Sequence, residues 1–426
     1  MMNSNFNKKV LFIFFYTIFL LVCSCTPILQ PPIEVDGIKP LWSTELPGKA
    51  GAYNDGLIGL PIYDGKILFH STYFTNINAE DNRIHALDIE TGEIKWTFPA
   101  NYNKDNSMFF WGVPYIYNEF LVAKMPKFGN ILLTDKLICI NLKTGQQEWQ
   151  KRLPASISFN SNDNIVGINT DFYFLQQSDS NTLIYKGNSQ NGDTTLLVKV
   201  IADKPEDYNR SSSSLQYFQT TNNDKYLFVG ALEEKKNSTD TYAYKTFVYI
   251  IDIEKKVLIK KLPIVREDKG QTINDMVSAN NRVYLACGRT TFCYNPNSES
   301  IEWSFSSLES YNYMANHIIV NNNIVFLYGD NRFIGLDSQT GKKLYQGDIQ
   351  CGNANAFNDF VYIIGSDAKL YIIDIKTGKI LHQITCPEKY TTHTGFLTGC
   401  KPHVFGDKLY VFGNYHAYCY DAVPKE

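Results

Sequence analysis

Short runs of β-branched and aromatic residues, each bounded by glycine, asparagine or aspartate, recur along most of the chain. The clearest are residues 65–71 (GKILFHS), 282–288 (RVYLACG), 323–329 (NIVFLYG), 360–366 (FVYIIGS) and 407–413 (DKLYVFG). Runs of this composition and length are typical of β-strands. Because no long helical period is visible between them, the pattern predicts an all-β chain.

A second pattern, which predicts a β-hairpin, follows these runs. Its best copy is residues 86–96 (ALDIETGEIKW). There Asp88 can accept hydrogen bonds from the amides just ahead of it, and Gly92 can adopt the positive φ that reverses the chain. Trp96 then offers a large ring to cover the neighbouring unit. Degraded copies stand at residues 139–149, 249–260, 293–303, 335–345 and 372–382.

Each unit therefore consists of four strands, which is the blade of a β-propeller. Equivalents of Asp88 fall at Asn141, Asn188, Asp252, Asn295, Asp337, Asp374 and Asp421, at spacings close to those of propeller repeats. The count predicts eight blades. The Asn188 unit is the weakest copy, and treating it as a loop gives a seven-bladed alternative. The same pattern assigns a structural, blade-docking role to Trp149, Trp303, Gly145, Gly341 and Gly378.

The last unit ends before a fourth strand can form, whereas residues 40–46 (PLWSTEL) form a strand without a partner near the start. In that strand Trp42 occupies the place that Trp96 has in its own unit. We therefore expect this N-terminal strand to complete the last blade, which closes the ring and removes an exposed sheet edge.

The first 24 residues have the features of a signal segment. Lys8 and Lys9 precede an apolar stretch at residues 10–22, which is short for a membrane span. The stretch resembles a bacterial lipoprotein signal in which Cys25 is the residue that receives lipid. The alternatives are an uncleaved anchor or an ordinary cleavable signal. Residues 25–39 are then a Pro-rich tether, and residues 40–426 form one propeller domain.

Thr26 follows the cysteine where, by resemblance to the sorting rule of enteric bacteria, an aspartate would retain the protein in the inner membrane. This favours the outer membrane, with the propeller facing the periplasm or, alternatively, displayed on the cell surface. Loss of the signal changes the formal charge from −3 to −5, with 38 basic and 43 acidic residues remaining. A mildly acidic chain lacks the basic patch of a nucleic-acid binder.

The remaining candidate chemistry is sparse. Two cysteine pairs, Cys287 with Cys293 and Cys386 with Cys400, are each candidates for a disulfide or for ordinary core packing. A metal is suggested only by His393, Cys400, His403 and His416, without the further ligands that a zinc site needs. Motifs for a nucleophile or a phosphate loop are absent from the sequence. We expect no catalytic residue, no cofactor and no metal.

Two polar segments interrupt the repeats and lengthen one interval. Residues 202–223 form an insertion that carries Tyr208, Tyr217 and Phe218, and residues 233–244 lengthen the next hairpin. Long connections are commonly functional or disordered. The three aromatic residues are therefore our candidates for an interaction surface, with tolerated surface insertion as the alternative.

The form A-x-D-x-x-T-G-x-x-x-W, present at residues 86–96, resembles the repeat of PQQ-like propellers, and the resemblance covers residues 40–424. It implies that each repeat tryptophan docks between neighbouring blades. Many quinoprotein dehydrogenases carry an adjacent pair of cysteines over the quinone, and this sequence has no such pair. The resemblance therefore supports the architecture and not a quinone cofactor.

A lipid-anchored propeller of this repeat type is most similar to the BamB-type outer-membrane lipoproteins. This resemblance implies a non-enzymatic scaffold, a monomer within a complex, whose partner is an envelope protein such as a β-barrel assembly component. Strand addition at a sheet edge would suit such clients. The alternative is a ligand-binding or quinone-dependent oxidoreductase propeller, in which Trp111 and Tyr313 at the channel mouth stack on a sugar or quinone.

Overall fold

A computed structural model describes residues 38–45, 58–59, 63–71, 83–100, 111–125, 136–153, 165–178, 181–201, 209–236, 242–264, 273–307, 315–329, 332–349, 351–387, 395–398, 400–413 and 416–423. The regular structure in these residues consists of thirty-two strands, which form eight antiparallel four-stranded sheets. Within the same residues there is no apolar helix of a length that could cross a membrane.

The sheets are numbered here as blades in chain order, and their strands run from the inside of the ring outward. Blades 1 to 4 contain β2 Ile58–Gly59, β3 Lys66–Ser71, β4 Arg83–Asp88 and β5 Ile94–Phe98; β6 Trp111–Tyr117, β7 Phe120–Met125, β8 Lys136–Asn141 and β9 Gln146–Arg152; β10 Val166–Ile168, β11 Asp171–Ser178, β12 Asn181–Asn188 and β13 Thr194–Ile201; β14 Asn209–Gln219, β15 Lys225–Lys236, β16 Tyr242–Asp252 and β17 Val257–Ile264.

Blades 5 to 7 follow the same order, and blade 8 takes its outer strand from the start of the chain. They contain β18 Ile273–Ala279, β19 Arg282–Cys287, β20 Thr290–Asn295 and β21 Ser300–Ser306; β22 Ala315–Asn321, β23 Ile324–Gly329, β24 Arg332–Asp337 and β25 Lys343–Gly347; β26 Cys351–Phe357, β27 Phe360–Gly365, β28 Leu370–Asp374 and β29 Ile380–Ile384; β30 His403–Phe405, β31 Lys408–Phe412, β32 His416–Asp421 and β1 Trp42–Glu45.

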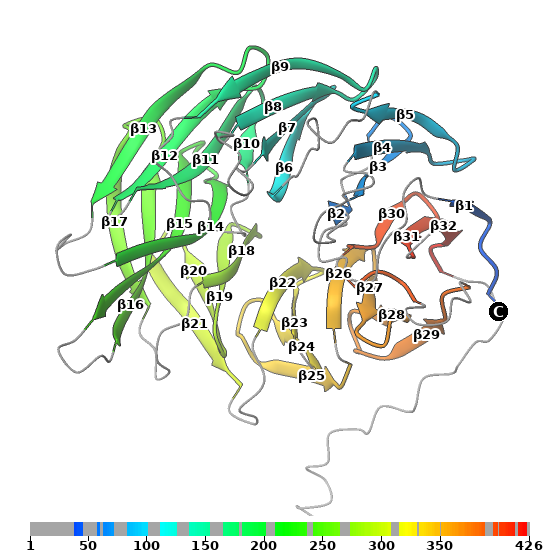
Figure 1. The fold of residues 1–426 in the computed structure, drawn as a ribbon. Helices are drawn as coiled ribbons and strands as arrows, with labels where there is room; N and C mark the ends of the chain where they lie inside the picture. The colour runs from blue at the N-terminus through cyan, green and yellow to red at the C-terminus, as the bar shows by residue number, and fades with distance from the viewer. Residues whose placement is uncertain are drawn as a thin grey trace, which may run out of the picture.

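The blades surround a central axis, as Figure 1 shows. The structure confirms the expected all-β propeller of four-stranded antiparallel blades. Every expected equivalent of Asp88 ends the third strand of its sheet, and the weak Asn188 unit forms a complete sheet, β10 to β13. The unit is therefore not the loop of the seven-bladed alternative.

The hydrophobic core lies between blades rather than at the centre of the ring. The residues that the structure describes contain eight clusters of buried side chains, and each cluster spans two consecutive blades. One of them joins Leu87 and Ile89 of blade 1 to Tyr410 and Phe412 of blade 8. Because an isolated blade would expose both of its faces, this apolar burial makes the blades depend on their neighbours.

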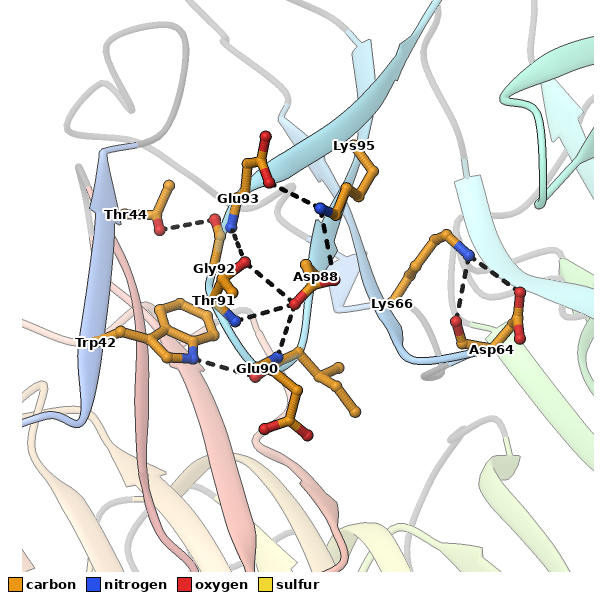
Figure 2. A network of polar contacts seen from close by, with 11 residues as sticks. Trp42, Thr44, Asp64, Lys66, Asp88, Glu90, Thr91, Gly92, Glu93 and Lys95 are labelled. Atoms are coloured by element: carbon orange, nitrogen blue, oxygen red, sulfur yellow. Dashed lines mark hydrogen bonds and ion pairs between the residues drawn. The ribbon is translucent and has the colours of Figure 1, made fainter.

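The N-terminal strand closes the ring as the sequence predicts. Strand β1 pairs antiparallel with β32, with Trp42 opposite Cys419 and Glu45 opposite His416. In Figure 1, β1 lies beside β32. The Trp42 indole donates to the Ile89 carbonyl of blade 1 at 3.1 Å, and Thr44 Oγ1 donates to the Gly92 carbonyl at 2.7 Å (Figure 2). The first strand of the domain therefore joins blade 8 to blade 1.

The outer strands carry a repeated irregularity. In blades 1 to 7 the pairing of the third and fourth strands shifts by one residue, and in six of them the extra residue directly precedes the position of the repeat tryptophan. In blade 1 the bulge lies between Ile94 and Trp96, which pair with Leu87 and Ala86. A bulge bends and twists its strand, so it re-aims the side chain that follows. We infer that the bulge turns the tryptophan toward the next blade.

Candidate interaction surface on blade 4

The repeat tryptophans dock onto the hairpin turn of the following blade. The Trp96 indole donates to the Leu142 carbonyl at 3.0 Å. A Cβ on Gly145, whose φ is +68°, would lie only 2.6 Å from the Trp96 ring. Glycine is thus required twice, by the positive φ and by the close approach of the ring. Trp149 makes the same contacts with Ser189 and Gly192, and Trp303 makes them with Ser338 and Gly341.

Two further contacts belong to this docking series. Trp42 covers Gly92, where an added Cβ would lie 2.6 Å from its ring. In blade 6 a tyrosine takes the place of tryptophan, and the Tyr345 hydroxyl donates to the Ile375 carbonyl while its ring covers Gly378. Five consecutive-blade interfaces therefore carry an aromatic dock, and the structure brings together the docking residues that the repeat assigns.

The aspartate of the repeat shapes the turn that receives the ring. Asp337 Oδ1 accepts from the Gln339 and Thr340 amides at 3.1 and 2.8 Å, and from the Thr340 hydroxyl at 2.8 Å. The hydroxyl and amide donors hold the pKa of Asp337 below its ordinary value. Asp88 and Asp374 accept from two amides in the same way. Figure 2 shows the Asp88 turn with Trp42 against it.

Blade 4 lacks this dock on both of its sides. Toward blade 3, the docking position is occupied by Leu196, which is half exposed, and the glycine position by Lys256, which keeps a positive φ of 57°. Toward blade 5, Lys260 replaces tryptophan and donates to the carbonyl and the carboxylate of Glu299 at 2.9 and 3.0 Å. An ion pair therefore takes the place of the packed ring.

Blade 4 also has the longest strands of the described part of the chain. Strands β14, β15 and β16 contain 11, 12 and 11 residues. Near the end of this extension Glu233 is only 1% exposed, and its Oε1 accepts from the Tyr249 hydroxyl at 2.9 Å and from Lys261 Nζ at 3.2 Å. Lys261 Nζ also lies 3.9 Å from the centre of the Phe247 ring. A buried carboxylate needs such partners, so this cluster fixes β15, β16 and β17 together.

The expected surface role of the polar insertion is wrong for Phe218. Residues 209–219 of this segment form β14, the inner strand of blade 4, rather than a loop. Phe218 is 4% exposed and packs edge-on against Phe228. Tyr217 is half-buried against the core between blades 3 and 4. Tyr208 lies outside the described residues. The extension of the next hairpin is found as expected, in β15 and β16.

The large apolar residues of blade 4 that are exposed, among those described, lie on its outer strand instead. We define the apolar strip as Val257, Leu258 and Ile259, the first three residues of β17, which are 44%, 38% and 47% exposed. The outer strand β13 of the preceding blade lies beside β17 (Figure 1), and its Leu196 and Ile201 are also exposed. Blade 2 has Gln146, Gln147 and Glu148 at the positions of the strip. An alignment of the repeats shows these apolar residues at positions that are polar in blade 2. Long polar loops in the sequence do not indicate them.

The charges around the strip are largely neutralised within the chain. Lys255 pairs with Asp252 at 2.8 Å, Lys260 with Glu299 at 3.0 Å, and Lys261 with Glu233 at 3.2 Å. The strip therefore offers mainly apolar contact, with Lys256 as the adjacent charge for which no ion pair is seen among the described residues. Its backbone is less suited to strand addition, because Ile259 is the bulged residue of β17 and Pro263 lacks an amide hydrogen. Bulges and prolines are common protections of sheet edges.

The other candidate groups do not form a site among the described residues. No group of three or more His, Cys, Asp or Glu side chains that could hold a metal occurs in that part of the chain. Tyr313, His393 and Cys25 lie outside it, as does the side chain of Trp111. The seven described cysteines are thiols rather than disulfides. The register explains one case, because Cys293 lies opposite Tyr284 and Cys287 opposite Thr290.

A protein-family model described as "Outer membrane protein assembly factor BamB" matches residues 34–203 and 261–425. The chain belongs to the BamB family. Its membership agrees with the resemblance seen in the repeat. The matched BamB-family segments leave out residues 204–260, which hold β14, β15 and β16 of blade 4. The blade that lacks both docks is thus also the one that departs most from the BamB family pattern.

Solved structures share the fold at low sequence identity. BamB from Moraxella catarrhalis is 12% identical with a TM-score of 0.58, over 90% of this chain and 100% of that chain. Sqt1 of Saccharomyces cerevisiae is 11% identical with a TM-score of 0.57, over 91% and 100%. The computationally designed Ika8 protein is 13% identical with a TM-score of 0.55, over 88% and 98%. A comparison with curated protein sequences gives no match.

Proposed function

We propose that this protein is a lipid-anchored, non-enzymatic scaffold of the bacterial envelope, and that its apolar strip docks a partner in outer-membrane protein assembly. Membership of the BamB family supports the assembly role. The observation that carries the docking site is the position of the strip: three consecutive exposed apolar residues lie on the blade that the family model skips. Adjacent exposed apolar residues of this kind mark protein–protein contacts more often than isolated ones do.

The chemistry of the strip suggests what the partner presents. Because Lys255, Lys260 and Lys261 are paired with carboxylates of the same chain, we expect the attraction to be mainly apolar rather than ionic. Apolar contacts are insensitive to moderate salt, whereas contacts between exposed charges are screened. We therefore expect an apolar surface or segment of an envelope protein to pack on the strip through side chains, and the complex to persist when the salt concentration is raised.

Capture from membranes tests the docking site. A variant with V257T, L258T and I259T keeps β-branched or strand-compatible residues while removing most of the apolar surface. Affinity capture after chemical crosslinking should recover an outer-membrane assembly component with the natural chain and several-fold less with the variant. The control is L344T, at an exposed leucine on the outer strand of blade 6. Equal recovery with the natural chain and the strip variant would rule out the strip as the docking site.

The anchor has its own test. Labelled fatty acid should enter the natural chain and not Cys25→Ala, because a thioether-linked lipid requires that cysteine. Outer-membrane vesicles separated by density should contain the natural chain, facing the periplasm. Equal incorporation of label in both chains would refute the anchor at Cys25, and it would leave the docking site on blade 4 to be judged by capture alone.

A further inference from the structure

The two ends of the ring differ in how they connect strands. At one end, here called the turn end, the first strand of each blade turns into the second and the third into the fourth. Residues with positive φ mark these turns in every blade, for example Asn118 and Gly145 in blade 2 and Gly406 in blade 8. The opposite end holds the connections between blades and the extended hairpin of β15 and β16.

The chain enters the propeller at the turn end of blade 8. The Leu41 amide donates to the Cys419 carbonyl at 2.7 Å, and β1 then runs away from the turn end as it pairs with β32. Ile38 packs against the core between blades 7 and 8. Twelve residues lie between Cys25 and Ile38, so the lipid-bearing residue lies within about 45 Å of this corner of the ring.

This same corner has an unusual apolar surface. Leu41, Phe405 and Val423 are 51%, 52% and 38% exposed, and they lie at the start of β1, at the first turn of blade 8 and just after β32. The two turns are joined, since the Ala422 amide donates to the Asp407 carbonyl at 2.7 Å. In the other seven blades the position of Val423 is polar: Glu90, Lys143, Gln190, Glu254, Asn297, Gln339 and Lys376.

We infer that the turn end of blade 8, with Leu41, Phe405 and Val423, rests on the lipid surface that holds the anchor. The inference depends on the anchor of the proposed function. A membrane fits this corner because the tether keeps the bilayer within reach. In addition, the free energy falls when partly exposed apolar side chains leave water for the headgroup region. Blade 4 lies across the ring from blade 8 (Figure 1), and its extended hairpin lies at the end opposite the turn end, so this hairpin remains accessible to a partner.

Photocrosslinking of the full lipidated chain tests this contact. The chain is reconstituted into vesicles of phosphatidylethanolamine and phosphatidylglycerol, with Phe405→photo-leucine or Val423→photo-leucine. The control is Gln190→photo-leucine, which occupies the Val423 position in blade 3. Lipid adducts at positions 405 and 423, several-fold above position 190, are the expected result. Flotation of the vesicles reports separately whether the anchor holds the chain.

Each other outcome contradicts the inference in a distinguishable way. A chain that floats with the vesicles without forming lipid adducts overturns the contact of blade 8 and leaves the anchor intact. Adducts to a second copy of the chain instead of lipid at positions 405 and 423 assign this corner to a contact between copies. Equal adducts at position 190 show that the ring has no preferred orientation. A chain that does not float overturns both the anchor and the inference that depends on it.

Discussion

The two interfaces of blade 4 and the five docked interfaces hold neighbouring blades together differently. Where an aromatic dock is present, the ring, its indole or hydroxyl hydrogen bond and the glycine beneath it fix one blade on the next. Both interfaces of blade 4 lack the dock, yet the cluster between blades 3 and 4 contains fourteen buried residues among those described. Apolar burial can therefore replace docking. As a result, the outer strand of blade 4 does not need the tryptophan that docking requires in other blades.

The absence of this requirement has a consequence for function. In the docked blade 2, the outer strand β9 carries Trp149 with a bulge before it, and the other positions of this strand are polar. In blade 4 the corresponding strand carries Val257, Leu258 and Ile259 toward solvent. Repeat architectures concentrate their variation at such surfaces because each unit contacts only its neighbours. Substitutions at matched positions should therefore affect docked and undocked interfaces differently.

The largest effect is expected from removing the strand that closes the ring. Deletion of residues 40–46 removes β1, the Trp42 dock and the hydrogen bond from Thr44 to Gly92. It also leaves β32 as an open edge. We expect a loss of at least about 4 kcal/mol, comparable to removal of a large buried side chain together with its packing. Thermal unfolding measures this, and a deletion that melts like the full chain would show that closure does not depend on β1.

Truncation at the docking position should separate the two kinds of interface. Trp303→Ala removes a buried ring and its hydrogen bond to Ser338, so we expect a loss of about 3 kcal/mol. Lys260→Ala, at the same repeat position in blade 4, should cost less than about 1 kcal/mol, because its partner Glu299 is largely exposed. Urea unfolding at low and high salt is the measurement. Similar losses for the two variants would mean that the docks are not what distinguishes blade 4.

Substitutions at the glycine position beneath the ring should have smaller effects on stability, of opposite sign in docked and undocked blades. In Gly145→Ala the new Cβ meets the Trp96 ring and φ stays positive, so we expect a loss of about 2 kcal/mol. Lys256→Gly relieves a positive φ where no ring docks, and it should gain up to about 1 kcal/mol. Urea unfolding gives both values. A stable Gly145→Ala variant would indicate that the Trp96 ring can shift without cost.

Sequence patterns predicted the ring better than they predicted its surface. The repeat of Asp88, Gly92 and Trp96 is local, and hairpin turns obey local rules, so the blades and the role of Trp42 could be placed. Exposure depends instead on which neighbour covers a strand. Phe218 was expected on the surface because residues 202–223 are polar, but residues 209–219 form an inner strand whose apolar side chains face two adjacent blades. Conversely, the sequence of Val257 to Ile259 is apolar like that of a core strand. Its exposure could not be predicted without knowing that no ring docks on this blade.

The smallest expected effect concerns the charge at the head of the turn. Hydrogen bonds from Thr340 and Gln339 lower the pKa of Asp337 in the folded chain, so its carboxylate stabilises the fold above the unfolded pKa. That contribution is lost as the pH falls through the folded pKa, below about pH 4. Asp337→Asn should keep the turn, since Asn141 accepts the same amide hydrogen bonds in blade 2, but it should flatten the acid limb of stability. Melting temperatures between pH 3 and pH 7 test this, and an unchanged acid limb would mean that the turn accepts a protonated aspartate equally well.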